Sequence, residues 1–184
     1  MEFRRVLFRS AVSQVYIAST TFENQYSAGY SGAVHIDSLL DGASYIENCD
    51  FINNRTNNTV SNIAGALYII NTDMLVKECR FIGNQSYYTG AVYLNNSNID
   101  IVNSVFAENR SLTQNTGALY IGAATGAAVN VINTTFYGNS AVLNGGAVCV
   151  LNHPLTINFT NTIFWNNTAR SEERRVGKEC RSRG

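Results

Sequence analysis

The sequence repeats itself about every 28 residues over most of its length, and this periodicity constrains the fold more than any other feature. Six phenylalanines recur at spacings of 29, 30, 25, 30 and 28 residues: Phe22, Phe51, Phe81, Phe106, Phe136 and Phe164. The third residue after each phenylalanine is Gln25 in the first copy and an asparagine afterwards: Asn54, Asn84, Asn109, Asn139 and Asn167. A Gly-Ala pair follows five of the phenylalanines, with its glycine at Gly32, Gly65, Gly90, Gly117 and Gly146. Two motifs that keep one register through five copies indicate a solenoid of stacked repeats.

Each repeat contains short segments in which apolar residues alternate with other residues, a pattern typical of β-strands. After the Gly-Ala pair, residues such as Val34 and Ile36 are predicted to point inward, and the residues between them outward. The two or three strands of each repeat are too short to bury their apolar faces if they form hairpins. Stacked coils would instead pair equivalent strands in parallel about 4.8 Å apart and enclose one continuous core. The sequence therefore predicts an all-β fold, a parallel β-helix of about six coils, right-handed by the usual crossover preference.

The three residues before each phenylalanine are predicted to form a corner of the coil. The third residue before it is usually asparagine, which tolerates a left-handed backbone and can bond to an identical amide one coil away. The second residue before it is Cys49 in one repeat and Cys79 in the next. Equivalent positions in adjacent coils lie within disulfide reach, while thiols that face a packed core often stay free as small hydrophobes. Both alternatives remain open for this pair.

The two ends of the chain differ in composition from the middle. Residues 1–10 carry three Arg and one Glu, and residues 170–184 carry six basic and three acidic residues. Between them, residues 11–169 hold four basic and nine acidic residues, a net charge of −5. Both ends resemble read-through translations of the adapter oligonucleotides used in short-read DNA sequencing. We therefore expect a β-helix fragment at 11–169 between two foreign ends; the alternative is a basic tail that binds an acidic surface.

The repeats resemble those of the polymorphic outer-membrane protein family, whose units pair Gly-Gly-Ala-(Ile/Leu/Val) with Phe-x-x-Asn. The best copies are FYGNSAVLNGGAVCV at 136–150 and FINNRTNNTVSNIAGALYI at 51–69. The chain departs from that pattern because only Gly145-Gly146 keeps both glycines, so the broader class of pectin-lyase-like β-helices also fits. The resemblance implies a secreted or surface-displayed passenger at the outer membrane, an autotransported adhesin or a rigid scaffold. The alternative is a non-catalytic portion of a polysaccharide lyase or glycoside hydrolase, because this fold hosts both activities.

Charge and hydropathy patterns argue against several functions. No basic stripe remains in the middle, which argues against nucleic acid as a partner. No apolar run approaches the roughly 18 residues of a membrane-spanning helix. His35 and His153 do not share a repeat position, and no cysteine pair has zinc spacing, so we expect neither a metal nor a cofactor. The acids Asp37, Asp41, Asp50, Asp73 and Asp100 are scattered without an adjacent pair, so we expect no catalytic residues in this chain.

The best binding-site candidate is the predicted outward row after the Gly-Ala pair, which contains His35, Tyr68, Tyr93 and Tyr120. Aromatic faces present apolar area to sugar rings and to partner side chains, so surface glycans or host and neighbouring proteins are the expected ligands. The alternative is a row that stacks on itself, stabilises the coil and is covered by loops. Open terminal coils would expose strand edges, so we also expect the isolated fragment to associate with itself.

Overall fold

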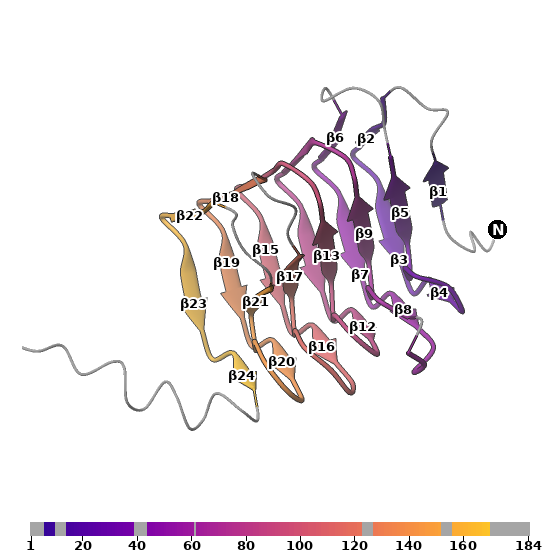
Figure 1. Cartoon of the computed structure of the whole chain (residues 1–184), viewed down its shortest axis with the longest axis vertical. Helices are drawn as coiled ribbons and strands as arrows, with labels where there is room; N and C mark the ends of the chain where they lie inside the picture. The colour runs from indigo at the N-terminus through magenta and orange to yellow at the C-terminus, as the bar shows by residue number, and fades with distance from the viewer. Residues whose placement is uncertain are drawn as a thin grey trace, which may run out of the picture.

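In a computed structural model, the chain is a parallel β-helix in which each coil contributes one strand to each of four sheets. The structure describes residues 6–9, 14–38, 44–60, 62–122, 127–151 and 156–169. Within these ranges all secondary structure is β, and each sheet contains six strands. Equivalent strands of successive coils lie beside one another along the column, as β3 to β23 show in Figure 1. The predicted fold class is confirmed.

The four sheets are named A to D in the order in which each coil visits them. Sheet A contains β1 (Val6–Arg9), β5 (Val34–Asp37), β9 (Leu67–Ile70), β13 (Val92–Asn95), β17 (Leu119–Gly122) and β21 (Val148–Leu151). Sheet B contains β2 (Tyr16–Ala18), β6 (Ser44–Glu47), β10 (Met74–Lys77), β14 (Ile99–Val102), β18 (Ala128–Ile132) and β22 (Thr156–Thr160). Sheet C contains β3 (Thr21–Glu23), β7 (Asp50–Ile52), β11 (Arg80–Ile82), β15 (Val105–Ala107), β19 (Thr135–Tyr137) and β23 (Ile163–Trp165). Sheet D contains β4 (Tyr26–Ser27), β8 (Arg55–Thr56), β12 (Gln85–Ser86), β16 (Arg110–Ser111), β20 (Ser140–Ala141) and β24 (Thr168–Ala169).

Sheet D was not anticipated. The sequence indicated two or three strands per coil, and the structure adds a fourth, two-residue strand directly after each asparagine of the Phe-x-x-Asn motif. Two residues are too few to show an alternating pattern, so periodicity could not reveal them. The strand β1 also lies within the segment expected to be foreign, and it pairs in parallel with β5. Residues 170–184, the other such segment, lie outside the described residues.

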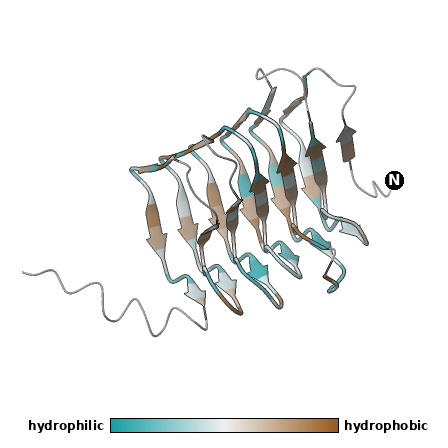
Figure 2. Cartoon of the chain, in the orientation of Figure 1, coloured by the Kyte–Doolittle hydropathy of each residue, from teal (hydrophilic) through white to brown (hydrophobic). Residues whose placement is uncertain are grey.

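The repeat register sets the core. The six phenylalanines of the motif pair with one another from β3 to β23, and each consecutive pair of rings is stacked with centroids 4.7–5.0 Å apart. The alternate aliphatic residues of sheets A and B join five of these phenylalanines, all except Phe164, in one buried cluster. Burying such stacked side chains from every coil in one core stabilises the column. Figure 2 shows the contrast with sheet D, where β8, β12 and β16 are hydrophilic.

The asparagines after the phenylalanines form a buried polar row inside the column. In Asn84, Nδ2 donates to the Phe51 carbonyl of the preceding coil at 2.8 Å and to Asn109 Oδ1 of the next coil at 2.9 Å. The backbone N–H of Asn84 also donates to Asn109 Oδ1, at 3.0 Å. The same pattern holds for Asn54, Asn109 and Asn139. Because these buried amide groups are bonded in every coil, the row fixes the register without a desolvation penalty.

Three rows of residues turn the chain with a left-handed backbone, and the shortest follows sheet A: Ser38, Asn71 and Asn96. The predicted corner row has positive φ throughout: Ser19, Asn48, Glu78, Asn103, Asn133 and Asn161. A second such row lies between sheets C and D: Asn24, Asn53, Gly83, Glu108, Gly138 and Asn166. The first row confirms the prediction that asparagine occupies corners, since asparagine tolerates this conformation better than most residues. The second row positions the strands of sheet D.

Candidate functional site

The sequence-predicted aromatic row lies on the outward side of sheet A and stacks along the column. Tyr68 pairs with Tyr93 and Tyr93 with Tyr120 in the strand register, and their ring centroids are 5.2 and 4.5 Å apart. His35 meets the Tyr68 ring edge-on, with centroids 4.7 Å apart. The structure therefore brings all four predicted binding residues into one continuous row.

Two further tyrosines cover this row. Tyr30 stacks on Tyr68 with centroids 5.7 Å apart, and Tyr88 meets the edge of Tyr120 at 5.4 Å. As a result, Tyr68, Tyr120 and His35 are buried. Burial, followed by the neighbouring Tyr93 hydroxyl, raises the pKa of Tyr68 to about 12. Of the two alternatives for this row, the geometry favours a self-stacking row that stabilises the coil, and the binding role stays a prediction.

Sequence reasoning missed Tyr30 and Tyr88, although a signal was present. Each lies two residues before the glycine of a Gly-Ala pair, Gly32 for Tyr30 and Gly90 for Tyr88. Equivalent positions of a solenoid lie on the same side of the column, so tyrosine at this position in two repeats indicates a cover shared by neighbouring coils.

A groove of about 390 Å³ lies on the outer face of sheet B. Its polar lining includes Asp73, Asn98, Asp100 and Asn130, and Tyr45 lies at one side. Asp73 accepts hydrogen bonds from the backbone and side-chain amides of Asn98 at 2.8 and 2.9 Å, and Asp100 accepts one from Asn130 at 2.7 Å. The acids treated as scattered are thus partly brought together, because the coil register places Asp73 and Asp100 along one groove.

A second hollow, of about 340 Å³, lies at the corner between sheets C and D. It is lined by Asn24, Asn53, Arg55, Gly83 and Gln85. Arg55 lies with its guanidinium carbon 5.4 Å from the centre of the exposed Tyr26 ring. Such cation–π contact restrains a guanidinium while leaving its N–H groups available.

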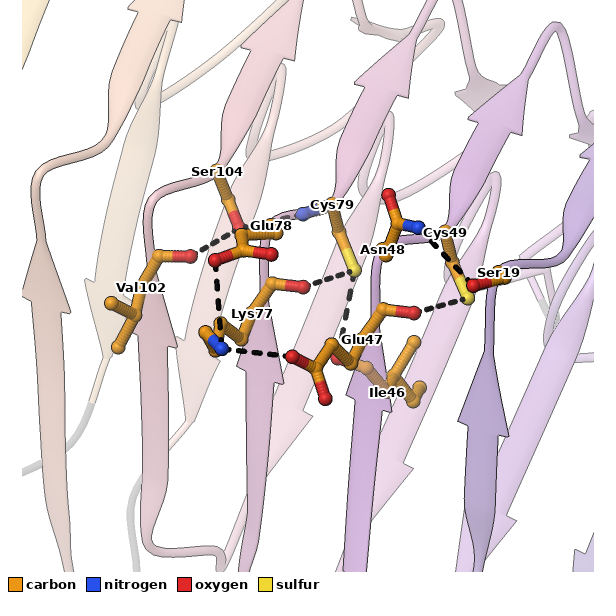
Figure 3. Close-up of polar contacts among 10 residues, drawn as sticks. All are labelled: Ser19, Ile46, Glu47, Asn48, Cys49, Lys77, Glu78, Cys79, Val102 and Ser104. Atoms are coloured by element: carbon orange, nitrogen blue, oxygen red, sulfur yellow. Dashed lines mark hydrogen bonds and ion pairs between the residues drawn. The ribbon is translucent and has the colours of Figure 1, made fainter.

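Two of the four basic residues in the middle of the chain, Lys77 and Arg80, lie in ion pairs. Lys77 Nζ lies 2.8 Å from Glu47 and 3.5 Å from Glu78, as Figure 3 shows. Arg80 donates from Nε to Asp50 at 2.6 Å and forms a second bond from its terminal nitrogen. The hydrogen bond from Arg80, followed by its charge, lowers the pKa of Asp50. Among the described residues, no ion pair includes Arg55 or Arg110.

Cys49 and Cys79 occupy equivalent positions in adjacent coils, and both are free and buried. Each Sγ points to the carbonyl two residues earlier, Glu47 for Cys49 and Lys77 for Cys79, both at 3.2 Å (Figure 3). Ser104 makes the same bond to Val102 with its hydroxyl, at 2.9 Å. The side-chain hydrogen bond with Cys49 and burial raise the pKa of the Cys79 thiol well above its ordinary value. The pair therefore fills a corner position that serine and threonine occupy in other coils.

Within the described ranges, no three His, Cys, Asp or Glu side chains come together in a group suited to a metal ion. His153 and Asp41, which the sequence pattern did not place in a metal or catalytic site, lie outside those ranges. No helix with the length and apolar character needed to cross a bilayer occurs in the described part of the chain.

Comparison of the chain with known families, curated proteins and solved structures finds no match in any of the three. The classification consequently depends on the parallel pairing and the repeat register, which together identify the chain as a parallel β-helix.

Proposed function

We propose that this chain is part of a non-catalytic, secreted or surface-displayed β-helix passenger that serves as an adhesin or scaffold. The observation that carries the proposal is that the side chains inside the column hold the coils together, while polar side chains line its outer surface. Inside, the phenylalanine and asparagine rows hold every coil in register. Outside, polar side chains recur at one strand spacing along sheets B and D, around two surface hollows. A rigid column with periodic polar faces is suited to holding an extended partner.

The repeat resemblance to the polymorphic outer-membrane proteins supports the location in this proposal. In this chain the Phe-x-x-Asn motif supplies both the phenylalanine row and the asparagine row, and a Gly-Ala pair precedes β5, β9, β13, β17 and β21. The binding role of His35, Tyr68, Tyr93 and Tyr120 stays a prediction. Because Tyr30 and Tyr88 cover the row, a ligand would reach those rings only after the covering tyrosines moved.

The second candidate, a portion of a polysaccharide lyase or hydrolase, is favoured by one observation. Asp73 and Asp100 lie in the same groove on sheet B, where an extended polysaccharide would lie along the column. Both carboxyl groups accept hydrogen bonds from neighbouring side-chain amides. Ionised carboxylates are suited to accepting protons, so this groove is the place to test for catalysis.

The test incubates the full chain with neutral, carboxylated and sulfated polysaccharides and measures both binding and the release of new reducing ends. The proposal expects binding without product. Product that disappears in the Asp100→Asn variant would instead establish the enzyme alternative.

Antibodies against the chain, applied to intact and to permeabilised source cells, test the location. Labelling of permeabilised cells alone would contradict surface display.

A further inference from the structure

The hollow at the corner between sheets C and D exists because one residue lacks a side chain. Gly83 stands in a row whose preceding members are Asn24 and Asn53, and all three have a left-handed backbone. A Cβ at Gly83 would overlap Asn53 Oδ1. The glycine therefore leaves a space of about 340 Å³ beside Arg55 and Gln85. The size lies at the lower end of the range for small-ligand sites.

The polar side chains around this space have no hydrogen-bond or ion-pair partner in the part of the chain that the structure describes. Among the described residues, no hydrogen bond uses the side-chain amides of Asn24, Asn53 or Gln85, and no ion pair uses Arg55. Several asparagines elsewhere on the outer surface are hydrogen-bonded to the adjacent coil. Asn158, for example, donates to Asn130 at 2.8 Å. None of the residues that line the hollow carries a negative charge. The site thus combines one cation with the side-chain amides of Asn24 and Gln85, which can donate N–H groups to an oxyanion.

A second cation lies along the same face of sheet D. The strand register aligns Arg55 with Gln85 and Gln85 with Arg110, so the two arginines stand two strand spacings apart, about 10 Å. Glu108 lies two residues before Arg110 at the corner and makes that end less positive than the hollow. A polymer with anionic groups spaced along its length can therefore contact Arg55 with one group and Arg110 with another.

We infer that this face binds a sulfated polysaccharide, with one sulfate group in the hollow beside Arg55 and a later one near Arg110. A sulfate presents oxygens in three directions and so accepts from a guanidinium and from amides on different sides, whereas a planar carboxylate presents two. Tyr26, under Arg55, offers its ring to a sugar face. The inference depends on the proposed binding function and names its ligand class.

The test uses the full chain and measures its affinity for heparin and for the same heparin after chemical removal of its sulfates. Arg55→Gln is expected to weaken heparin binding about tenfold, the effect of losing one charge-assisted contact. Gly83→Asn is expected to weaken it similarly without changing the net charge, because the new side chain fills the hollow. Asparagine is the residue at the equivalent corners, so the backbone accepts this change. Arg80→Gln is the matched control, since it removes the same charge from an ion-paired arginine on sheet C.

Equal losses in Arg55→Gln and Arg80→Gln would overturn the inference, because binding would then depend on net charge alone. Equal affinity for desulfated heparin, or for single-stranded DNA of the same charge, would overturn it too. Thermal unfolding curves confirm that each variant is folded. Different results would contradict the proposed function. Polysaccharide cleavage or an intracellular location would contradict it, whatever the affinity of the chain for heparin.

Discussion

At the scale of single residues, the tyrosines of sheet A are the groups whose chemistry the fold changes most. Tyr68 is stacked under Tyr30 and Tyr120 is covered edge-on by Tyr88, and burial is the largest cause of the raised pKa values of Tyr68 and Tyr120. A raised pKa means that the folded chain favours the neutral phenol. The row therefore contributes stability that depends on the tyrosines keeping their protons.

This dependence predicts loss of stability in alkali. The stabilising contribution of Tyr68 is fully present below its ordinary pKa of 10.0 and is lost as the pH rises toward its folded value of about 12. Denaturant unfolding at increasing pH, together with the ultraviolet absorbance of phenolate, measures both effects. Tyr88→Ala uncovers the row and should move the transition to lower pH, whereas Tyr26→Ala, at an exposed ring, should not. Titration of all tyrosines near pH 10.0, with no change in stability, would refute this account.

At the scale of strands, the glycines of the Gly-Ala pairs determine how closely successive coils approach. A Cβ at Gly90 would overlap the carbonyl oxygen of Gly117 in the next coil, and Gly65 has the same relation to Gly90. These carbonyls belong to the backbone and cannot rotate away. The coils that carry a Gly-Ala pair therefore need glycine two residues before the strand of sheet A.

We predict that Gly90→Ala destabilises the chain by at least about 3 kcal/mol, because two backbones would have to separate. The matched control is Gly138→Asn, where the nearest heavy atom to an added Cβ is the flexible Glu108 side chain at 3.7 Å. Gly138 has φ +62°, and three equivalent corners hold asparagine, so this change should cost less than about 1 kcal/mol. Chemical denaturation of both variants checks the difference, and equal losses would contradict the steric explanation.

The strands and coil register were predictable because the repeat supplies five comparisons for each position. Phe81, Asn84 and Gly90 each have equivalents in neighbouring coils, so their roles follow from spacing. The cover over the tyrosine row and the hollow beside Arg55 were not predicted. They depend on how Tyr30 and Tyr88 fold back and on Gly83, one of two glycines in a corner row whose other members are polar. Features that arise from loop conformation, or from one departure in a repeat, leave no periodic signal.

At the scale of the whole molecule, the two ends of the column differ in exposure. Phe164 in the last described coil is 47% exposed and Trp165 is 68% exposed, whereas Phe22 in the first phenylalanine strand is 8% exposed. Figure 1 places β23 at the edge of its sheet, with β19 on one side. Exposed apolar side chains beside an unpaired strand edge favour pairing with another chain.

We predict that the chain associates with itself through β23 and that the double variant Ile163→Thr, Trp165→Glu reduces this association. Threonine and glutamate occupy the equivalent positions in β3, as Thr21 and Glu23, so the strand tolerates both changes. Light scattering across a concentration series measures the mass. Val60→Thr, at an exposed residue outside the named strands, is the control. A chain that stays monomeric at high concentration would contradict the prediction.

The buried asparagine row has a consequence for the electrostatics of the column. In every coil the side-chain oxygen faces the preceding coil, and one side-chain N–H faces the next. The amide dipoles therefore add head to tail along the axis, as peptide dipoles do in an α-helix. The axis gains an electrical direction, with its positive pole toward Asn167 and its negative pole toward Asn54. An anion is consequently stabilised beyond Asn167, and a cation beyond Asn54.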